Sequence, residues 1–314
     1  MAWLEPGRPN QDVFAEVLLS LARADRNIVV LTSDSRGSGK LGPFGKALPN
    51  QLIEMGIAEQ NLVGVAAGLA STGKIVFAVS PACFQTARAL EQIKADVAYS
   101  GHPVKLVGIS AGVSYGPLGS THHSLHDLAA LSAIPGLTIV VPADNHETEE
   151  AVMAAVRFPG PLYLRFGKKA MPHLHDANVP FEIGRAILLR EGSDVTFIAT
   201  GEMVAEAARA CDLLAPQGLS CGLVSMHTVK PLDVEAVLSA ASRCRAIITV
   251  EEHSVYGGLG SQCAALLMQR GRRARFRIAA LPDEPAVTGS QGEIFQHYGL
   301  DAAGLAQMAL TLLG

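Results

Sequence analysis

Residues 53–73 read IEMGIAEQNLVGVAAGLASTG, and the apolar run Ile75–Val79 follows almost directly. The Ala-rich segment Glu59–Ala70 has the composition and spacing of a closely packed helix, whereas Ile75–Val79 is typical of a buried strand. A carboxylate, Glu59, begins that helix among Gly, Ile, Ala and Val. Burial favours the protonated form of a carboxylic acid, which can donate a strong hydrogen bond to a cofactor. A structural interpretation also stays open, in which Glu59 only stabilises the helix dipole.

Helix and strand alternate along the whole chain, which predicts an α/β protein with parallel sheets flanked by helices. Between residues 170 and 182 the sequence loses its periodicity and becomes rich in His, Pro, Asp and Asn, as in an interdomain connection. We therefore expect a first domain over 1–169, a linker over 170–182 and a smaller α/β domain over 183–314. Expected strands are 28–31, 75–79, 104–110, 137–141 and 162–165 in the first domain, and 194–199, 221–225, 246–251 and 276–280 in the second, a sheet of three to four strands. Expected helices are 12–24, 59–70, 86–99, 125–131, 147–157, 205–214, 234–241 and 260–269.

The composition excludes several classes of protein. The chain has 314 residues, of which 49% are hydrophobic and 17% charged, so it is neither a disordered chain nor a collagen. A formal net charge of −4 offers no basic surface for nucleic acid. No apolar run approaches the roughly 20 residues that a membrane-spanning helix needs, so we expect no membrane partner. The five cysteines form no CxxC pair and no signal peptide precedes them, which indicates a cytoplasmic protein.

Other motifs give weaker signals. The Gly-rich segments Gly37–Gly39 and Gly257–Gly260 match neither a P-loop nor a dinucleotide-binding fingerprint. His122 and His126, with Asp127 beside them, would suit zinc only if another ligand stood at a recognisable spacing. We expect no metal ligand in this chain and assign the histidines to polar substrate contacts. A hydrolase is excluded because no G-x-S-x-G elbow is present.

Several motifs together make the chain resemble the transketolase family. They are GIAEQN at 56–61, DSRGS at 34–38, STH at 120–122, LR at 164–165, MHTVKPLD at 226–233 and VEEHSVYGGLG at 250–260. The similarity covers the C-terminal half of transketolases and deoxyxylulose-phosphate synthases, and it extends from about residue 10 to the end of the chain. It implies a pyrimidine-binding domain followed by a transketolase C-terminal domain.

The resemblance implies thiamine diphosphate as the cofactor. In this family the Glu of the GIAEQ-like motif, here Glu59, hydrogen-bonds the pyrimidine ring and activates the cofactor. The matching positions make Ile57 and Phe84 further cofactor contacts, with the pyrimidine stacked on Phe84. Pro81 stands where a second Phe is common, so we expect a less aromatic pocket than is usual in the family. Phe84 as an ordinary core residue is the alternative.

The resemblance also implies a sugar-phosphate substrate. Arg165, together with Ser38 four residues after Asp34, matches the phosphate-binding residues of the family. An Arg fork and a hydroxyl group suit a phosphate dianion. His122 matches the catalytic His that contacts the oxygens of the substrate.

Two further positions, besides Pro81, depart from the family pattern. The Asp that commonly precedes the substrate-contacting His by four residues is Leu118 here, and the usual N-terminal Arg is Gln11. Both changes affect substrate recognition. As the substrate, a branched sugar, a deoxysugar and a sulfonated sugar therefore stay open alternatives to xylulose phosphate.

The chain contains no GDG motif, which in this family belongs to the domain that holds the diphosphate through Mg²⁺ or Ca²⁺. The resemblance thus implies a split transketolase, in which a separate N-terminal subunit supplies that domain and the metal. We expect an α2β2 complex that moves a two-carbon ketol unit between sugar phosphates, with the apolar Leu62–Ala70 face at a subunit contact. Two alternatives stay open, namely the beta subunit of a 2-oxo-acid dehydrogenase and a non-catalytic scaffold subunit.

Overall fold

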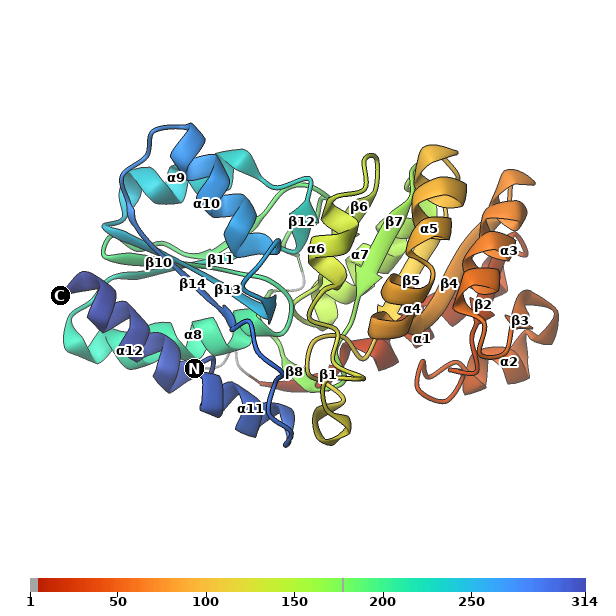
Figure 1. The fold of residues 1–314 in the computed structure, drawn as a ribbon, viewed down its shortest axis with the longest axis horizontal. Helices are drawn as coiled ribbons and strands as arrows, with labels where there is room; N and C mark the ends of the chain where they lie inside the picture. The colour runs from red at the N-terminus through yellow and green to blue at the C-terminus, as the bar shows by residue number, and fades with distance from the viewer. Residues whose placement is uncertain (1–4, 177) are drawn as a thin grey trace.

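The computed structural model describes residues 5–176 and 178–314. Its helices and strands form two α/β units that lie side by side along the longest axis of the molecule (Figure 1). The N-terminal unit is built on a seven-stranded sheet and the C-terminal unit on a five-stranded sheet. The predicted α/β class is therefore confirmed.

The seven-stranded sheet has the order β12-β6-β7-β5-β4-β2-β3 and is parallel except at its β12 edge. Its parallel strands are β2 (Ile28–Thr32), β3 (Leu52–Glu54), β4 (Ile75–Pro81), β5 (Lys105–Ile109), β6 (Thr138–Val140) and β7 (Leu162–Arg165). Strands β2 and β5 are buried along their whole length, which explains their continuous apolar sequence. The sequence prediction omits β3, because this edge strand of three residues is too short and too exposed to show a pattern.

Helices cover both faces of this sheet (Figure 1). One face packs against α1 (Asn10–Ala24), α2 (Gly42–Ala47) and α7 (Asn145–Arg157). The other carries α3 (Glu59–Ser71), α4 (Ala82–Arg88), α5 (Leu90–Gln92), the π-helix Ile93–Tyr99 and α6 (Asp127–Ser132). The predicted single helix over 86–99 is thus divided into three pieces.

Helix α3 buries its apolar side chains within its own chain. Leu62, Val63 and Ala66 are fully buried in one cluster with residues of β2, β4 and β5. The strands of the same chain thus cover part of this face, whereas Val65 and Leu69 are only partly buried. That the remainder of the face makes a subunit contact stays a prediction.

The C-terminal unit has the strand order β14-β13-β10-β11-β9, with β9 antiparallel to β11 and the other pairs parallel. Its strands are β9 (Ile187–Arg190), β10 (Val195–Ala199), β11 (Cys221–Ser225), β13 (Ala246–Ser254) and β14 (Arg275–Leu281). Its helices are α8 (Met203–Leu214), α9 (Val234–Arg243), α10 (Leu259–Gln269), α11 (Gln291–Tyr298) and α12 (Ala302–Leu313). The expectation of three to four strands is wrong, because it omits β9 at the edge of the sheet.

Two short strands pair with segments distant in the sequence. Strand β8 (Ala170–Pro172) lies within the predicted linker and pairs antiparallel with β1 (Pro6–Pro9). Strand β12 (Thr228–Lys230) comes from the C-terminal half of the chain but pairs with β6 in the first sheet.

Short 3₁₀ turns occur at Pro49–Gln51, Gly116–Leu118 and Ala215–Gln217. Within the residues described, no helix combines the length and the apolar character that crossing a bilayer requires.

A buried ionic cluster joins the linker to helix α7. The imidazole of His175 lies between two carboxylates, with Nδ1 3.0 Å from Asp144 Oδ2 and Nε2 3.1 Å from Glu147 Oε1. Burial alone would lower the pKa of His175, but these two carboxylates outweigh it and raise the pKa to about 10. Ser225 of β11 donates to Glu147 Oε1 at 2.6 Å, so the cluster connects both units.

Candidate active site

Glu59 lies near the carboxyl edge of the seven-stranded sheet, as the first residue of α3. Ligand sites of parallel α/β sheets form at this edge, where the loops that follow neighbouring strands meet. The Glu59 side chain is only 4% exposed, and its partner is Arg88. Arg88 Nη1 donates to both carboxylate oxygens, at 2.9 Å and 3.0 Å.

The ring of Phe84 packs against Arg88, the partner of Glu59. Phe84 and Arg88 are four residues apart on α4, a spacing that places both on one helix face. The Arg88 guanidinium carbon lies 4.2 Å from the centroid of the Phe84 ring. The His122 ring approaches the same phenyl ring from its edge, with the centroids 5.3 Å apart. The structure thus brings three predicted site residues together: Glu59, Phe84 and His122.

His122 lies in the loop between β5 and α6. Thr121 Oγ1 is 2.9 Å from His122 Nδ1, and the Tyr115 ring packs against the imidazole with its centroid 5.5 Å away. Lys168 reaches this group from beyond β7 and holds its Nζ 4.7 Å from the centre of the Tyr115 ring. The loop therefore carries an imidazole and lies beside an exposed cation.

The C-terminal unit anchors the same loop. The backbone N–H of Val113 donates to Glu252 Oε1 at 2.7 Å. Gln291 Nε2 also donates to this oxygen, and to Glu202 Oε2, at 2.9 Å each. Burial and the nearby Glu252 carboxylate raise the pKa of Glu202 to about 8. The position of the His122 loop thus depends on contacts with the C-terminal unit.

Asp34 and Ser38 lie on the loop that follows β2, at the same edge of the sheet. Asp34 has a φ of 51°, a left-handed conformation that is uncommon outside glycine. Its backbone N–H is held by Glu54 Oε1 at 2.7 Å. A Cβ added at Gly39 would lie 3.3 Å from Val79, which shows how closely this loop covers β4. Both side chains are exposed, and their substrate role stays a prediction.

Arg165, at the end of β7, is buried in a structural network. Its side chain is 5% exposed, and Nε donates to Asp127 Oδ2 at 2.7 Å. Nη2 donates to the carbonyl oxygens of Ser124 and Glu252 at 3.0 Å each. Burial opposes ionisation of Asp127, but the Arg165 charge outweighs it and the pKa of Asp127 is lowered. These contacts favour a structural role for Arg165 and lend no support to the predicted phosphate contact.

Ile57 lies two residues before Glu59 and is 73% exposed, which is unusual for a large apolar side chain. Among the positions that depart from the family pattern, Leu118 is 54% exposed, whereas Gln11 is 1% exposed and lies away from solvent. Pro81 ends β4 and leads the chain directly into α4. Leu118 is thus the departure that the structure leaves available for contact with a ligand or another chain.

The residues around Glu59 fit the pyrimidine part of the implied cofactor. A buried carboxylate lies beside the face of an aromatic ring, and the space between them already accommodates a planar guanidinium group. Over residues 5–176 and 178–314, no three His, Cys, Asp or Glu side chains are grouped to hold a metal ion.

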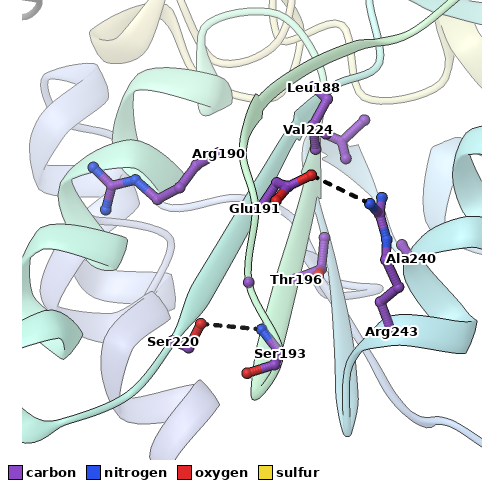
Figure 2. A pocket seen from close by; sticks show the side chains of 10 residues that line it. Leu188, Arg190, Glu191, Ser193, Thr196, Ser220, Val224, Ala240 and Arg243 are labelled. Carbon is purple, nitrogen blue, oxygen red and sulfur yellow. Dashed lines mark hydrogen bonds and ion pairs between the residues drawn. The ribbon is translucent and has the colours of Figure 1, made fainter.

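A cavity of about 350 Å³ lies elsewhere, in the C-terminal unit (Figure 2). Arg243 and Glu191 form an ion pair across it at 3.7 Å, and Ser193 and Ser220 are joined by a hydrogen bond. It opens near the amino end of β10, opposite to the edge where sites in parallel sheets form. We therefore assign the site to the Glu59 region.

Comparison with known proteins gives the family of the chain. Residues 8–173 match the model of the transketolase pyrimidine-binding domain, and residues 184–305 match that of the transketolase C-terminal domain. The chain belongs to the transketolase family. This confirms the resemblance seen in the sequence, including the identification of the C-terminal half of a transketolase.

Similar transketolases include several encoded as separate subunits. The chain is 48% identical over 301 residues to an apulose-4-phosphate transketolase subunit of Phocaeicola vulgatus, with 96% of each chain covered. It is 40% identical to a 6-deoxy-6-sulfo-D-fructose transketolase subunit of a Clostridium species, covering 82% of this chain and 80% of the relative. The structure matches "Split gene transketolase, inactive beta4 tetramer" with a TM-score of 0.87 and 36% identity, over 98% of this chain and 100% of the other.

Sequence reasoning did not single out Arg88 and Lys168, which the structure places against Phe84 and Tyr115 beside the predicted site residues. The FQTAR segment carries a signal for Arg88, because its spacing from Phe84 places both side chains on one helix face. Lys168 carries no such signal, since it lies 53 positions after Tyr115, the residue it contacts in the fold.

Proposed function

We propose that this chain is the C-terminal subunit of a two-chain, thiamine-diphosphate-dependent transketolase. The observation that carries the proposal is the buried Glu59 carboxylate beside Phe84 and His122 at the carboxyl edge of the sheet. When bound, the cofactor supplies the nucleophile and electron sink for transfer of a two-carbon ketol unit. Similarity to subunits of split transketolases supports this assignment over a 2-oxo-acid dehydrogenase or an inactive scaffold.

The residues of this chain take distinct roles in the proposed site. Glu59 accepts or shares a proton with the pyrimidine ring, and Phe84 provides the stacking surface. Ile57 covers the cofactor from the other side. His122 contacts substrate oxygens, and Asp34 and Ser38 contribute polar groups from the loop after β2.

We assign the substrate phosphate to Lys168 in place of the buried Arg165. Lys168 is exposed, and its ammonium group reaches the ring of Tyr115, which in turn packs against His122. An ammonium group binds phosphate as a point charge and needs no fixed fork geometry. Because two relatives at 48% and 34% identity are named for apulose 4-phosphate, that sugar phosphate is the first substrate to test.

We propose that a separate N-terminal subunit supplies the diphosphate-binding domain and the metal, in an α2β2 complex located in the cytoplasm. The exposed Ile57, next to Glu59, fits a site that a second chain completes. The similar split-gene protein that is described as an inactive β4 tetramer fits a subunit without activity on its own.

A coupled ketol-transfer assay tests the proposal. The chain mixed with its N-terminal subunit should turn over a phosphorylated ketose only when thiamine diphosphate and Mg²⁺ are present. Glu59→Gln should lower kcat at least about a hundredfold, as expected for loss of an acid–base group, with an unchanged melting temperature. The proposal fails if the mixture decarboxylates 2-oxo acids but transfers no ketol unit, or if Glu59→Gln keeps full activity.

A further inference from the structure

The side chain of Arg88 makes two contacts that the proposed function assigns to the cofactor. Its edge donates hydrogen bonds to both oxygens of Glu59, at 2.9 Å and 3.0 Å. Its face lies on the Phe84 ring, with 4.2 Å between the guanidinium carbon and the ring centroid. A guanidinium group is planar and carries its N–H donors in the plane, so it resembles a pyrimidine edge that donates to Glu59 while stacked on an aromatic ring.

We propose that Arg88 occupies the pyrimidine position in the free subunit and must leave it before thiamine diphosphate binds. This inference rests on the proposed function, because it takes Glu59 and Phe84 as the cofactor contacts. Two planar groups cannot occupy one face of Phe84 at stacking distance while both use the same carboxylate.

The exposure of the two partners shows which one moves. The Arg88 side chain is 47% exposed, whereas that of Glu59 is 4% exposed. Arg88 is also the last residue of α4, so its long side chain can turn into solvent without displacing the helix. Glu59 begins α3, whose apolar side chains are packed against the sheet, and it stays in place.

The contact between Arg88 and Glu59 also stabilises the free subunit. A buried carboxylate without a partner is strongly destabilising, and Arg88 supplies that partner. A donor on the cofactor then replaces the guanidinium when the complete site forms. The apparent affinity for the cofactor is reduced by the fraction of molecules in which Arg88 still occupies the position.

Cofactor affinity in the two-chain enzyme tests the proposal. The dissociation constant of thiamine diphosphate is measured by calorimetry with Mg²⁺ for wild type, Arg88→Met and Arg88→Lys. Lys94→Met is the matched control, because Lys94 is an exposed cation of the adjacent π-helix that pairs only with Glu91, 3.8 Å away, among the contacts described. We expect Arg88→Met to bind about tenfold more tightly, Arg88→Lys to lie between it and wild type, and Lys94→Met to match wild type.

A second readout uses stability without cofactor. Arg88→Met should lower the melting temperature of the cofactor-free subunit, since Glu59 then lacks its partner. Added cofactor should bring the melting temperatures of the variant and the wild type together. Equal or weaker cofactor binding by Arg88→Met, while wild type binds normally, would overturn the inference and indicate that Arg88 belongs to the loaded site. Absence of cofactor binding by the wild-type complex would instead overturn the proposed function.

Discussion

The guanidinium Nε of Arg165 lies 2.7 Å from Oδ2 of Asp127, and the two side chains are 5% and 0% exposed. Tyr163 donates to the same oxygen at 2.8 Å, so Asp127 is the centre of a buried network that joins β7 to α6. Removing one member of such a pair leaves an uncompensated buried charge.

Arg165→Met should therefore lower the free energy of unfolding by about 3–5 kcal/mol, measured by urea denaturation. Arg185→Met is the control, because Arg185 pairs with Glu235 at the surface and its loss should change stability little. Unchanged stability in Arg165→Met, together with a loss of activity confined to phosphorylated substrates, would restore the predicted phosphate contact.

Because of the His175 cluster, the stability of the protein should decrease as the pH rises into the alkaline range. The folded-state pKa of about 10 lies above the ordinary value of 6.5, so the folded state holds the His175 proton more tightly than the unfolded state. This contribution to stability is fully present below pH 6.5 and is lost as the pH rises to about 10. In His175→Gln, the difference in melting temperature from wild type should be largest at about pH 6.5 and shrink as the pH rises toward 10. A difference that stays constant from pH 6.5 to 10 would show that His175 is not protonated in the folded protein.

The phosphate assignment to Lys168 predicts a selective defect. Lys168→Met should raise KM for a phosphorylated ketose by roughly tenfold, because it removes a charge-assisted contact, and should leave stability unchanged. A non-phosphorylated analogue should show little change in KM. Lys169→Met is the neighbouring control, since Lys169 pairs with Glu206 at 3.7 Å. Similar changes for both substrates, or for both variants, would remove Lys168 from the site.

Local sequence patterns predicted most of the fold. Apolar runs such as Cys221–Ser225 coincide with a strand whose residues are all buried, because both faces of a parallel sheet are covered. The edge strands β3 and β9 escaped prediction, because their apolar runs have only two or three residues and most of their side chains are partly exposed. Strand β12 joins the first sheet through tertiary pairing with β6, for which its three residues give no local signal.

Those site residues that lie within one sequence motif could be predicted. Contacts between segments distant in the sequence could not. GIAEQN placed Glu59 at the start of a helix, and the structure adds its burial. The contacts of Arg165 involve residues 38 to 87 positions away, so no local pattern could distinguish a buried ion pair from a phosphate contact. The position of Arg88 depends on how α4 faces α3, which is likewise a property of packing.

Thiamine diphosphate binding tests the divided site most directly. Calorimetry with Mg²⁺ should show little binding to this chain alone, and stoichiometric binding once the N-terminal subunit is added, because the proposed site divides the pyrimidine and diphosphate contacts between two chains. Tight binding of thiamine diphosphate by this chain alone, or none by the two-chain mixture, would contradict the account.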